Sequence, residues 1–435
     1  MQIQSALVLF GVFGALVSFG VPISFAIGLA STACITFLMN LDQSAIISAQ
    51  RIATGLDSFT LLAIPFFILA GNIMNRGGIA MRMIELAKIL GGRLPGSLAH
   101  CNVLANMLFG SISGSAVASA AAVGGIMSPL QKKEGYDPAF SAAVNAASCP
   151  TGMLIPPSAA LIVFSLISGG VSVATLFVAG YLPGILMGLS VMVVAGIIAK
   201  KRNYPVMEKP TLKETMYKLA DSILPLFLIV IIMGGIIGGI FTATEASAVA
   251  VVYALILACG IYKEVKISQI PSIILESAVT TSIVLLLIGC SISMSWAMAF
   301  SGIPAVISSS LAGISDNPII IILMINVVLL VVGSFMDMTP ALLIFTPIFM
   351  PVATHLGMDP VHFGIMMVYN LCIGVVTPPV GASLFVACSV GGVSIKNIVK
   401  PMLPFYAAVI SILMLVTFMP QITLLLPKLV LGYGG

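Results

Sequence analysis

Four short polar segments interrupt otherwise apolar sequence, and their oxygen atoms suit a small hard cation. They span residues 110–115, 145–152, 333–340 and 370–381. Hard cations bind hydroxyl, amide and backbone carbonyl oxygens, and an oxygen-lined cage with few full charges favours Na⁺. The predicted sodium ligands are Ser111, Ser113, Ser115, Asn145, Thr151, Gly152, Ser334, Asp337, Thr339, Asn370, Gly374 and Thr377. A single small residue of this kind is equally typical of close helix packing, so the prediction depends on the four segments together.

Two Pro-Pro pairs, at 156–157 and 378–379, predict where an anionic substrate binds. A helix broken at such a pair presents a new helix start at the middle of the membrane, with free N–H groups and about half a positive charge. No Lys or Arg lies in the four segments, so this dipole or an exposed Arg elsewhere must hold an anion. The predicted substrate-binding residues are Pro156, Pro157, Ser158, Pro378, Pro379, Gly381 and Ser383.

Four further polar side chains could have either a functional or an ordinary structural role. Asp337 is an acid at membrane depth, which by default indicates function, but an Asp directly before a helix is also typical of an N-cap. Glu245 is expected in the first turn of a helix that a preceding Thr caps. His355 and His362 have no acidic partner at metal-ligand spacing, so both are expected in solvated loops rather than at a metal site.

The elements that position these residues belong to an internal sequence repeat. Residues 135–172 align without a gap on residues 357–394, at a constant offset of 222, and share the Pro-Pro pair and a Gly-Gly-Val-Ser run. A Gly/Pro-interrupted apolar segment in each half is typical of the binding site of a secondary transporter. The predicted domains are a first membrane repeat at 1–199, a basic cytoplasmic linker at 200–221 and a second membrane repeat at 222–435.

Opposed charges on equivalent loops predict that the two repeats are inverted. Lys132 and Lys133 precede the first copy, whereas Lys396 and Lys400 follow the second. Basic loops remain in the cytoplasm, so equivalent loops lie on opposite sides of the membrane; a parallel duplication would need matching charges. The predicted fold is an all-α polytopic membrane protein with two broken helices and two re-entrant helical hairpins, at 98–129 and 319–353. The prediction also includes ten membrane crossings of about 20 residues each, with both termini outside.

The composition indicates an integral membrane protein and excludes several classes. The chain is 60% hydrophobic and 7% charged, with a mean hydropathy of +1.19, so a soluble domain is excluded. A net charge of +4 is better explained by membrane orientation than by nucleic-acid binding. The sequence has no nucleotide-binding loop, zinc-protease motif or nucleophile elbow, which argues against an enzyme. No cofactor is expected beyond Na⁺ as a coupling ion.

Five segments resemble the large membrane subunit of tripartite ATP-independent periplasmic (TRAP) transporters. They are 109–115, 152–158, 239–246, 337–340 and 376–381, and the resemblance covers nearly the whole chain. It implies an elevator-type, Na⁺-driven transporter in the bacterial inner membrane that takes up a carboxylated solute such as a dicarboxylate, sialic acid, a keto acid or a sugar acid. It also implies two partners, a periplasmic solute-binding protein and a small four-helix membrane subunit. The tips and breaks then become the sodium sites and the substrate cradle.

Two other functions remain open at this point. One is a stand-alone ion-coupled carboxylate carrier or antiporter of related inverted-repeat fold, which would need no binding protein. The other is an intramembrane enzyme, which would need paired acids or a nucleophile with a base. The isolated position of Asp337 argues against the enzyme.

Overall fold

The computed structural model describes residues 2–92, 94–207, 212–315 and 317–434, and these residues form helices joined by short connections. The helices of the first half are α1 (Gln2–Ser18), α2 (Ile23–Leu38), α3 (Leu41–Leu56), α4 (Ala63–Arg76), α5 (Ile79–Gly91), α6 (Ser97–Ser113), α7 (Ala116–Lys133), α8 (Pro138–Ser148), α9 (Thr151–Leu154), α10 (Ala159–Ile167) and α11 (Val173–Lys201). Those of the second half are α12 (Leu212–Ile237), α13 (Ala243–Leu255), α14 (Ile270–Ser301), α15 (Ile303–Ile314), α16 (Pro318–Phe335), α17 (Met338–His355), α18 (Pro360–Gly374), α19 (Ala382–Gly391), α20 (Ile395–Phe418) and α21 (Pro420–Leu431).

The duplication seen in the sequence extends to the helix boundaries. The starts of α7 and α17, of α8 and α18, and of α11 and α20 each differ by 222 residues. Local sequence explains the agreement at α8 and α18, since both begin with an Asp N-cap followed by Pro, whose fixed φ and missing N–H suit the first helical position. The predicted hairpins are confirmed as the pairs α6–α7 and α16–α17, and the predicted breaks separate α8 from α10 and α18 from α19.

Equivalent residues of the two halves meet at the centre of the molecule. The thiol of Cys372 lies 3.5 Å from the backbone carbonyl oxygen of Pro150, and these two positions differ by the repeat offset. Two equivalent positions can touch only where the symmetry axis that relates them passes. The structure therefore places a pseudo-two-fold axis between the two broken helices.

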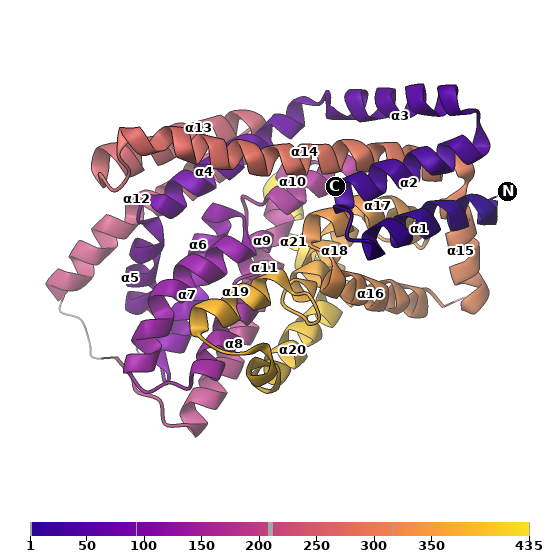
Figure 1. Ribbon diagram of the computed structural model, residues 1–435. Coiled ribbons are helices and arrows are strands. Elements are labelled where there is room, and N and C mark those ends of the chain that lie inside the picture. The colour runs from indigo at the N-terminus through magenta and orange to yellow at the C-terminus, as the bar shows by residue number, and fades with distance from the viewer. Residues whose placement is uncertain (1, 93, 208–211, 316, 435) are drawn as a thin grey trace.

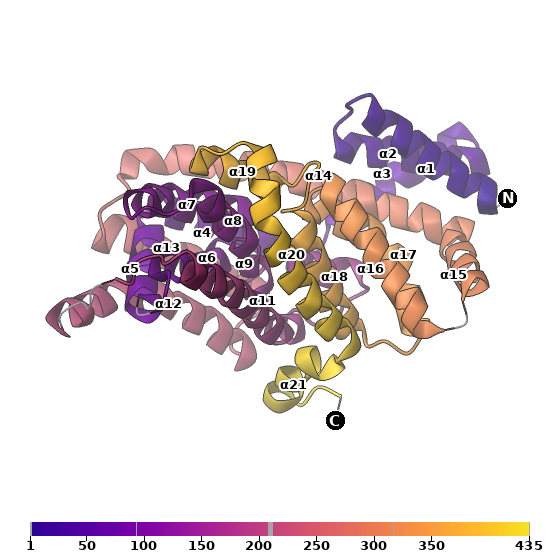
Figure 2. The same cartoon turned by 90° about the horizontal axis from the view of Figure 1, so that it is seen from below.

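The two halves interleave around this axis to form one core, which we define as α6–α11 and α16–α21. Helix α19 packs on α7 and α8, and its equivalent α10 packs on α17 and α18. In the same way α20 packs on α8, and α11 packs on α18. Figure 2 shows α20 of the second half beside α8 and α11 of the first.

The remaining long helices form a separate layer, the scaffold, which consists of α1–α4 and α12–α14. Helix α14 has 32 residues, about 48 Å of helix, and runs along α2, α3 and α4, while α13 packs on α4 (Figure 1). Helices α5 and α15 join the two layers: α5 packs on α6 and α12, and α15 packs on α17 and α1. We call the boundary between core and scaffold the seam.

Length and hydropathy identify candidate membrane spans in the described part of the chain. Eight helices are long and apolar enough to cross a membrane, or nine if the pair 138–154 and 159–167, bent by 49°, counts as one span. The eight include α16 and α17, both arms of the second hairpin, so this criterion does not separate a crossing from a re-entrant arm. The protein is thus a multi-pass membrane protein, and the crossing number given above stays a prediction.

Two local predictions have different outcomes. The cap at Glu245 is confirmed, because Thr242 Oγ1 accepts from the Glu245 N–H at 3.2 Å and the Glu245 carboxylate accepts from the Thr242 N–H at 2.8 Å. The solvated loop at His362 is wrong. This residue lies in the first turn of α18 and is 2% exposed, and its ring nitrogens lie 2.7 Å from Thr423 Oγ1 and 3.1 Å from the Thr417 carbonyl oxygen.

The first residues of the linker between the halves contact the core. Helix α11 continues to Lys201 and α12 begins at Leu212, so both helices enter the predicted linker 200–221, and residues 208–211 lie outside the described residues. The Arg202 guanidinium lies 2.7 Å from the Asp137 carboxylate, and the Tyr204 ring stacks on Tyr136 at 4.2 Å between centroids.

Candidate ion and substrate site

Paired glycines bring each hairpin tip into contact with the helix break of the same half. A Cβ atom added to Gly152 would lie 2.2 Å from two backbone carbons of Gly110, and one added to Gly374 would lie 2.5 Å from the Cα of Gly333. Both distances are too short for any side chain, so only glycine permits this approach of two backbones. The predicted tip and break segments therefore lie together in both halves.

Below the first tip, buried amides join α6, α7 and α8. The Asn106 amide nitrogen lies 3.0 Å from Asn145 Oδ1 and 2.7 Å from Ser148 Oγ, and the Ser119 hydroxyl donates to Asn106 Oδ1 at 2.7 Å. The Asn145 amide in turn donates to the Ala120 carbonyl oxygen at 2.9 Å. Asn145, a predicted sodium ligand, thus holds the two arms of the hairpin to the broken helix.

The second half has a related contact that is less complete. The Asn370 amide on α18 donates to Asn326 Oδ1 on α16 at 2.9 Å and to the Asn326 carbonyl oxygen at 3.0 Å. Its own Oδ1 atom and the hydroxyl of Ser383 are buried and have no hydrogen-bond partner among the described residues. A buried polar atom without a partner costs about 1–3 kcal/mol. These two oxygens are therefore the kind of atom that a bound cation or solute would satisfy.

Most of the predicted hydroxyl ligands donate their proton to a carbonyl of their own segment. The distances are 2.8 Å for Ser111 to Leu108, 2.6 Å for Thr151 to Ser148, 2.7 Å for Ser334 to Val331 and 2.7 Å for Thr377 to Ile373. A hydroxyl that donates still has lone pairs available. This arrangement therefore leaves oxygen atoms that can bind a cation at both tips and both breaks.

Asp337 occupies the N-cap position of α17 without performing the capping role. Its backbone has cap geometry, but the side chain accepts no capping hydrogen bond from the helix. The side chain is exposed. Thr339, the second residue of the same helix, is half-buried. The structure thus leaves the Asp337 carboxylate available at the second tip.

The two Pro-Pro segments lead into helix starts, as predicted, but the starts differ. The Ser158 hydroxyl caps α10, accepting from the Leu161 N–H at 3.5 Å. Gly381 precedes α19 with φ of +38° and offers no side-chain cap. There the Val380 N–H instead donates to the Ser334 carbonyl oxygen at 3.0 Å, which adds a direct hydrogen bond between the second break and the second tip.

A cavity of about 380 Å³ opens at the first tip, on the seam. Of the predicted residues it brings together Ser113, Ser115 and Pro157. The scaffold side contributes polar groups that sequence reasoning did not single out: Asn72, Asn75, Glu276 and Thr280. We call this space the tip cavity.

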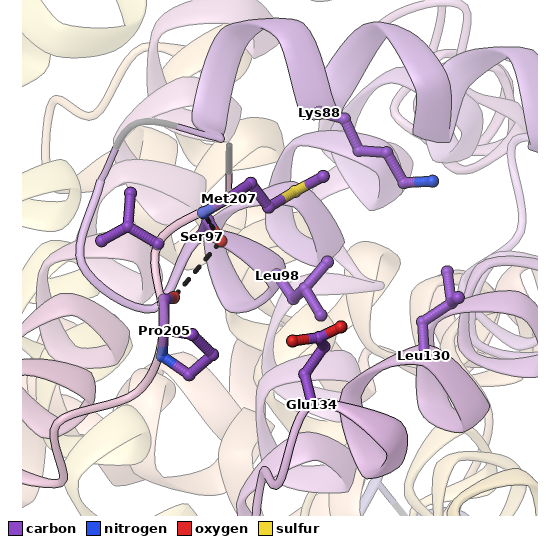
Figure 3. A pocket seen from close by; sticks show the side chains of 8 residues that line it. Lys88, Ser97, Leu98, Leu130, Glu134, Pro205 and Met207 are labelled. Carbon is purple, nitrogen blue, oxygen red and sulfur yellow. Dashed lines mark hydrogen bonds between the residues drawn. The ribbon is translucent and has the colours of Figure 1, made fainter. Parts of the chain in front are cut away.

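A larger cavity, of about 480 Å³, lies at the base of the first hairpin and is shown in Figure 3. Its lining includes Lys88, Glu134 and Ser97, and the Ser97 hydroxyl accepts from the Met207 N–H at 3.2 Å. Ser97 is the first residue of α6, and the tip lies at its other end, about 24 Å away at the rise of an α-helix. This cavity is therefore separate from the tips and breaks.

Comparison with known proteins identifies the family. Residues 10–422 match the family described as "Tripartite ATP-independent periplasmic transporter, DctM component". The chain belongs to this TRAP permease family. An uncharacterized protein of Salmonella typhimurium is 58% identical to this TRAP permease over 427 residues, covering 98% of each chain. The large permease of a sialic acid TRAP transporter from Vibrio cholerae is 39% identical, covering 98% of this chain and 99% of its own.

The same fold occurs in a solved structure of distant sequence. The crystal structure of the YdaH transporter from Alcanivorax borkumensis, described as having an unusual topology, matches the TRAP permease with a TM-score of 0.58. The match covers 85% of this chain and 86% of that chain, at 13% sequence identity. It therefore concerns the fold alone.

Two sets of residues at the site of the TRAP permease were missed in the sequence. Asn106 and Asn326 lie within apolar hairpin arms, and an amide there is a recognisable signal because it must find a partner. Glu276 and the pair Asn72 and Asn75 lie in apolar scaffold spans, where a polar side chain is costly enough to indicate function.

Proposed function

We propose that this TRAP permease uses a Na⁺ gradient to import a carboxylated solute across the bacterial inner membrane. Similar permeases are named for transporters of sialic acid, 2,3-diketo-L-gulonate and C4-dicarboxylates, and each of these solutes carries a carboxylate. In this proposal a periplasmic solute-binding protein delivers the solute, and a small four-helix membrane subunit completes the membrane complex.

The observation that carries the proposal is the contact between tip and break, made through glycines in both halves. It places the hydroxyl and carbonyl oxygens of two chain segments side by side without an intervening side chain. Na⁺ bound to oxygens of both segments, such as Ser111 and Thr151 in the first half, would stabilise the contact. The unpartnered oxygen of Asn370 supports a second ion in the second half. Ion binding would then fix the geometry of the solute cradle.

In this proposal the solute carboxylate binds at the starts of α10 and α19, beside the two Pro-Pro segments. The first N–H groups of a helix have no partner within it, and the helix dipole favours an anion at this end. Pro157 reaches the tip cavity, so the start of α10 is open to a molecule there. Ser383, with its buried and unpartnered hydroxyl, supplies a donor at the start of α19.

The layered fold supports movement of the core as one body against the scaffold. Because the halves interleave, neither half of the core can move without the other. The tip cavity lies beside Arg76 and Glu276, near the ends of α4 and α14 that adjoin the basic loop 263–266. That loop is predicted to be cytoplasmic, so the arrangement corresponds to an inward-facing state of an elevator.

The test is uptake into vesicles that contain this chain with its small subunit. Each of a panel of periplasmic binding proteins, loaded with sialic acid, 2,3-diketo-L-gulonate or a C4-dicarboxylate, is added outside under an inward Na⁺ gradient. We expect uptake of one solute that requires both its binding protein and Na⁺. Uptake of free solute without any binding protein would instead identify a stand-alone carrier, and uptake on a proton gradient without Na⁺ would reject sodium coupling.

A further inference from the structure

A second cavity on the seam, of about 350 Å³, contains an arginine that has no acidic partner among the described residues. It is lined by Arg51 of α3, by Ser291, Ser295 and Trp296 of α14, and by Leu166 and Gly169 at the end of α10. The cavity thus lies between two scaffold helices and one core helix. Its volume is within the range of small-molecule sites.

Arg51 differs from the other arginines among the described residues. Arg76, Arg82 and Arg202 each lie within 3.1 Å of a carboxylate, of Glu276, Asp221 and Asp137 respectively. The Arg51 guanidinium instead lies 5.0 Å from the centroid of the Trp296 ring. Stacking of this kind holds the planar group in place and leaves its N–H edge free for a bidentate contact with an oxyanion.

A second residue of this cavity has a buried hydroxyl without a partner among the described residues. Ser291 is 3% exposed, and its oxygen makes no hydrogen bond within the described residues. A buried hydroxyl in this condition is destabilising unless something else satisfies it. Arg51 and Ser291 are thus two residues of one cavity whose polar groups have no hydrogen-bond or ion-pair partner among the described residues, and a carboxylate bound there would be a partner for each.

The position of the cavity along two helices places it opposite the basic loops. Gly169 precedes the start of α11, a 29-residue helix that ends at the basic linker. Trp296 lies near the end of α14 that is remote from the basic loop 263–266. If those loops are cytoplasmic, the cavity faces the periplasm. The tip cavity lies on the same seam, with Thr280 of α14 in its wall, about 24 Å from Trp296 along the helix.

We propose that Arg51, Trp296 and Ser291 form an oxyanion site at the outer end of the seam that receives the carboxylate of the solute before it reaches the tips. The inference depends on the proposed function for the identity of the solute. The site chemistry alone would also accept the phosphate of an anionic lipid. Arg51 binds through charge and paired hydrogen bonds, Ser291 donates one further bond, and Trp296 orients the guanidinium.

The chain supplies its own probe, because Trp296 is its single tryptophan. We propose to titrate the purified full chain in detergent with succinate, sialic acid, succinamide as a neutral analogue, and phosphatidylglycerol, while following tryptophan fluorescence. A saturable change is expected with at least one carboxylate and none with succinamide. Arg51→Gln should weaken the apparent affinity by roughly tenfold or more, and Arg51→Lys by less. Lys396→Gln, which removes the same charge at an exposed position, should bind as wild type does.

Three other outcomes are distinguishable, and they separate failure of the site from failure of the proposed function. A carboxylate response that Arg51→Gln leaves unchanged, or no Arg51-dependent response to any probe, would reject the site. An Arg51-dependent response to phosphatidylglycerol that no carboxylate displaces would assign it to lipid. Uptake is measured in parallel: a wild-type chain that binds carboxylate at Arg51 but shows no Na⁺-driven uptake would reject the proposed function and leave the site standing.

Discussion

The backbone of Gly152 lies against that of Gly110 so closely that a methyl group on Gly152 would fall 2.2 Å from the Gly110 Cα. We expect Gly152→Ala to force the first tip away from the first break and to abolish Na⁺-dependent uptake, because the ion would lose ligands from one of the two segments. Gly374→Ala should do the same through Gly333. Gly125→Ala is the matched control, since a Cβ on this α7 residue meets no atom within 4 Å. Normal uptake by Gly152→Ala at normal expression would show that the contact is not required.

The sodium prediction is tested most directly at the first tip. Removing both hydroxyls with Ser113→Ala and Ser115→Ala should raise the Na⁺ concentration for half-maximal uptake severalfold, because two oxygens that line the tip cavity are lost. Ser411→Ala is a suitable control, since this exposed hydroxyl only donates to the carbonyl of Ala407 in its own helix. An unchanged Na⁺ dependence in the double variant would exclude these hydroxyls as ligands.

Inverted topology can be tested at two equivalent positions. Lys133 and His355 differ by the repeat offset, both are exposed, and each ends the second arm of its hairpin. In a background without the seven native cysteines, Lys133→Cys should react with a membrane-impermeant maleimide only from the cytoplasmic side. His355→Cys should react only from the periplasmic side. Labelling of both from one side would establish a parallel duplication.

The buried amide cluster below the first tip should contribute measurably to stability. Asn106→Ala would remove the buried partner of the Ser119 hydroxyl and of Asn145 Oδ1, at a cost of about 1–3 kcal/mol for each atom that no other group satisfies. We expect a clearly lower melting temperature in detergent. Asn397→Ala, at an exposed position, should melt as wild type does. Equal melting temperatures for the two variants would show that water or a rearranged side chain replaces the lost bonds.

The features predicted from sequence were those with a local chemical cause. Hairpin turns and helix breaks follow from Gly and Pro, and both appear at the predicted positions in the two halves. Partners far apart in sequence could not be predicted. The sequence around Asn106 does not indicate that its amide donates to Asn145, and the sequence around Ser113 does not indicate that it shares a cavity with Asn72. Both arrangements form only when the core packs on itself and on the scaffold. The error at His362 has the same origin, since its polar partners lie on the last two helices.

The interleaved packing of α10 on α17 has a consequence for how the protein is made. When α10 leaves the ribosome, the helix that will cover it has not been synthesised. At about 5–20 residues per second, the interval between Ile167 and His355 is roughly 10–40 s. During this time a broken helix with exposed N–H groups must remain in the membrane or the translocon without its permanent neighbour. We expect the first half expressed alone to be a substrate for membrane proteases, and co-expression of the second half as a separate chain to protect it.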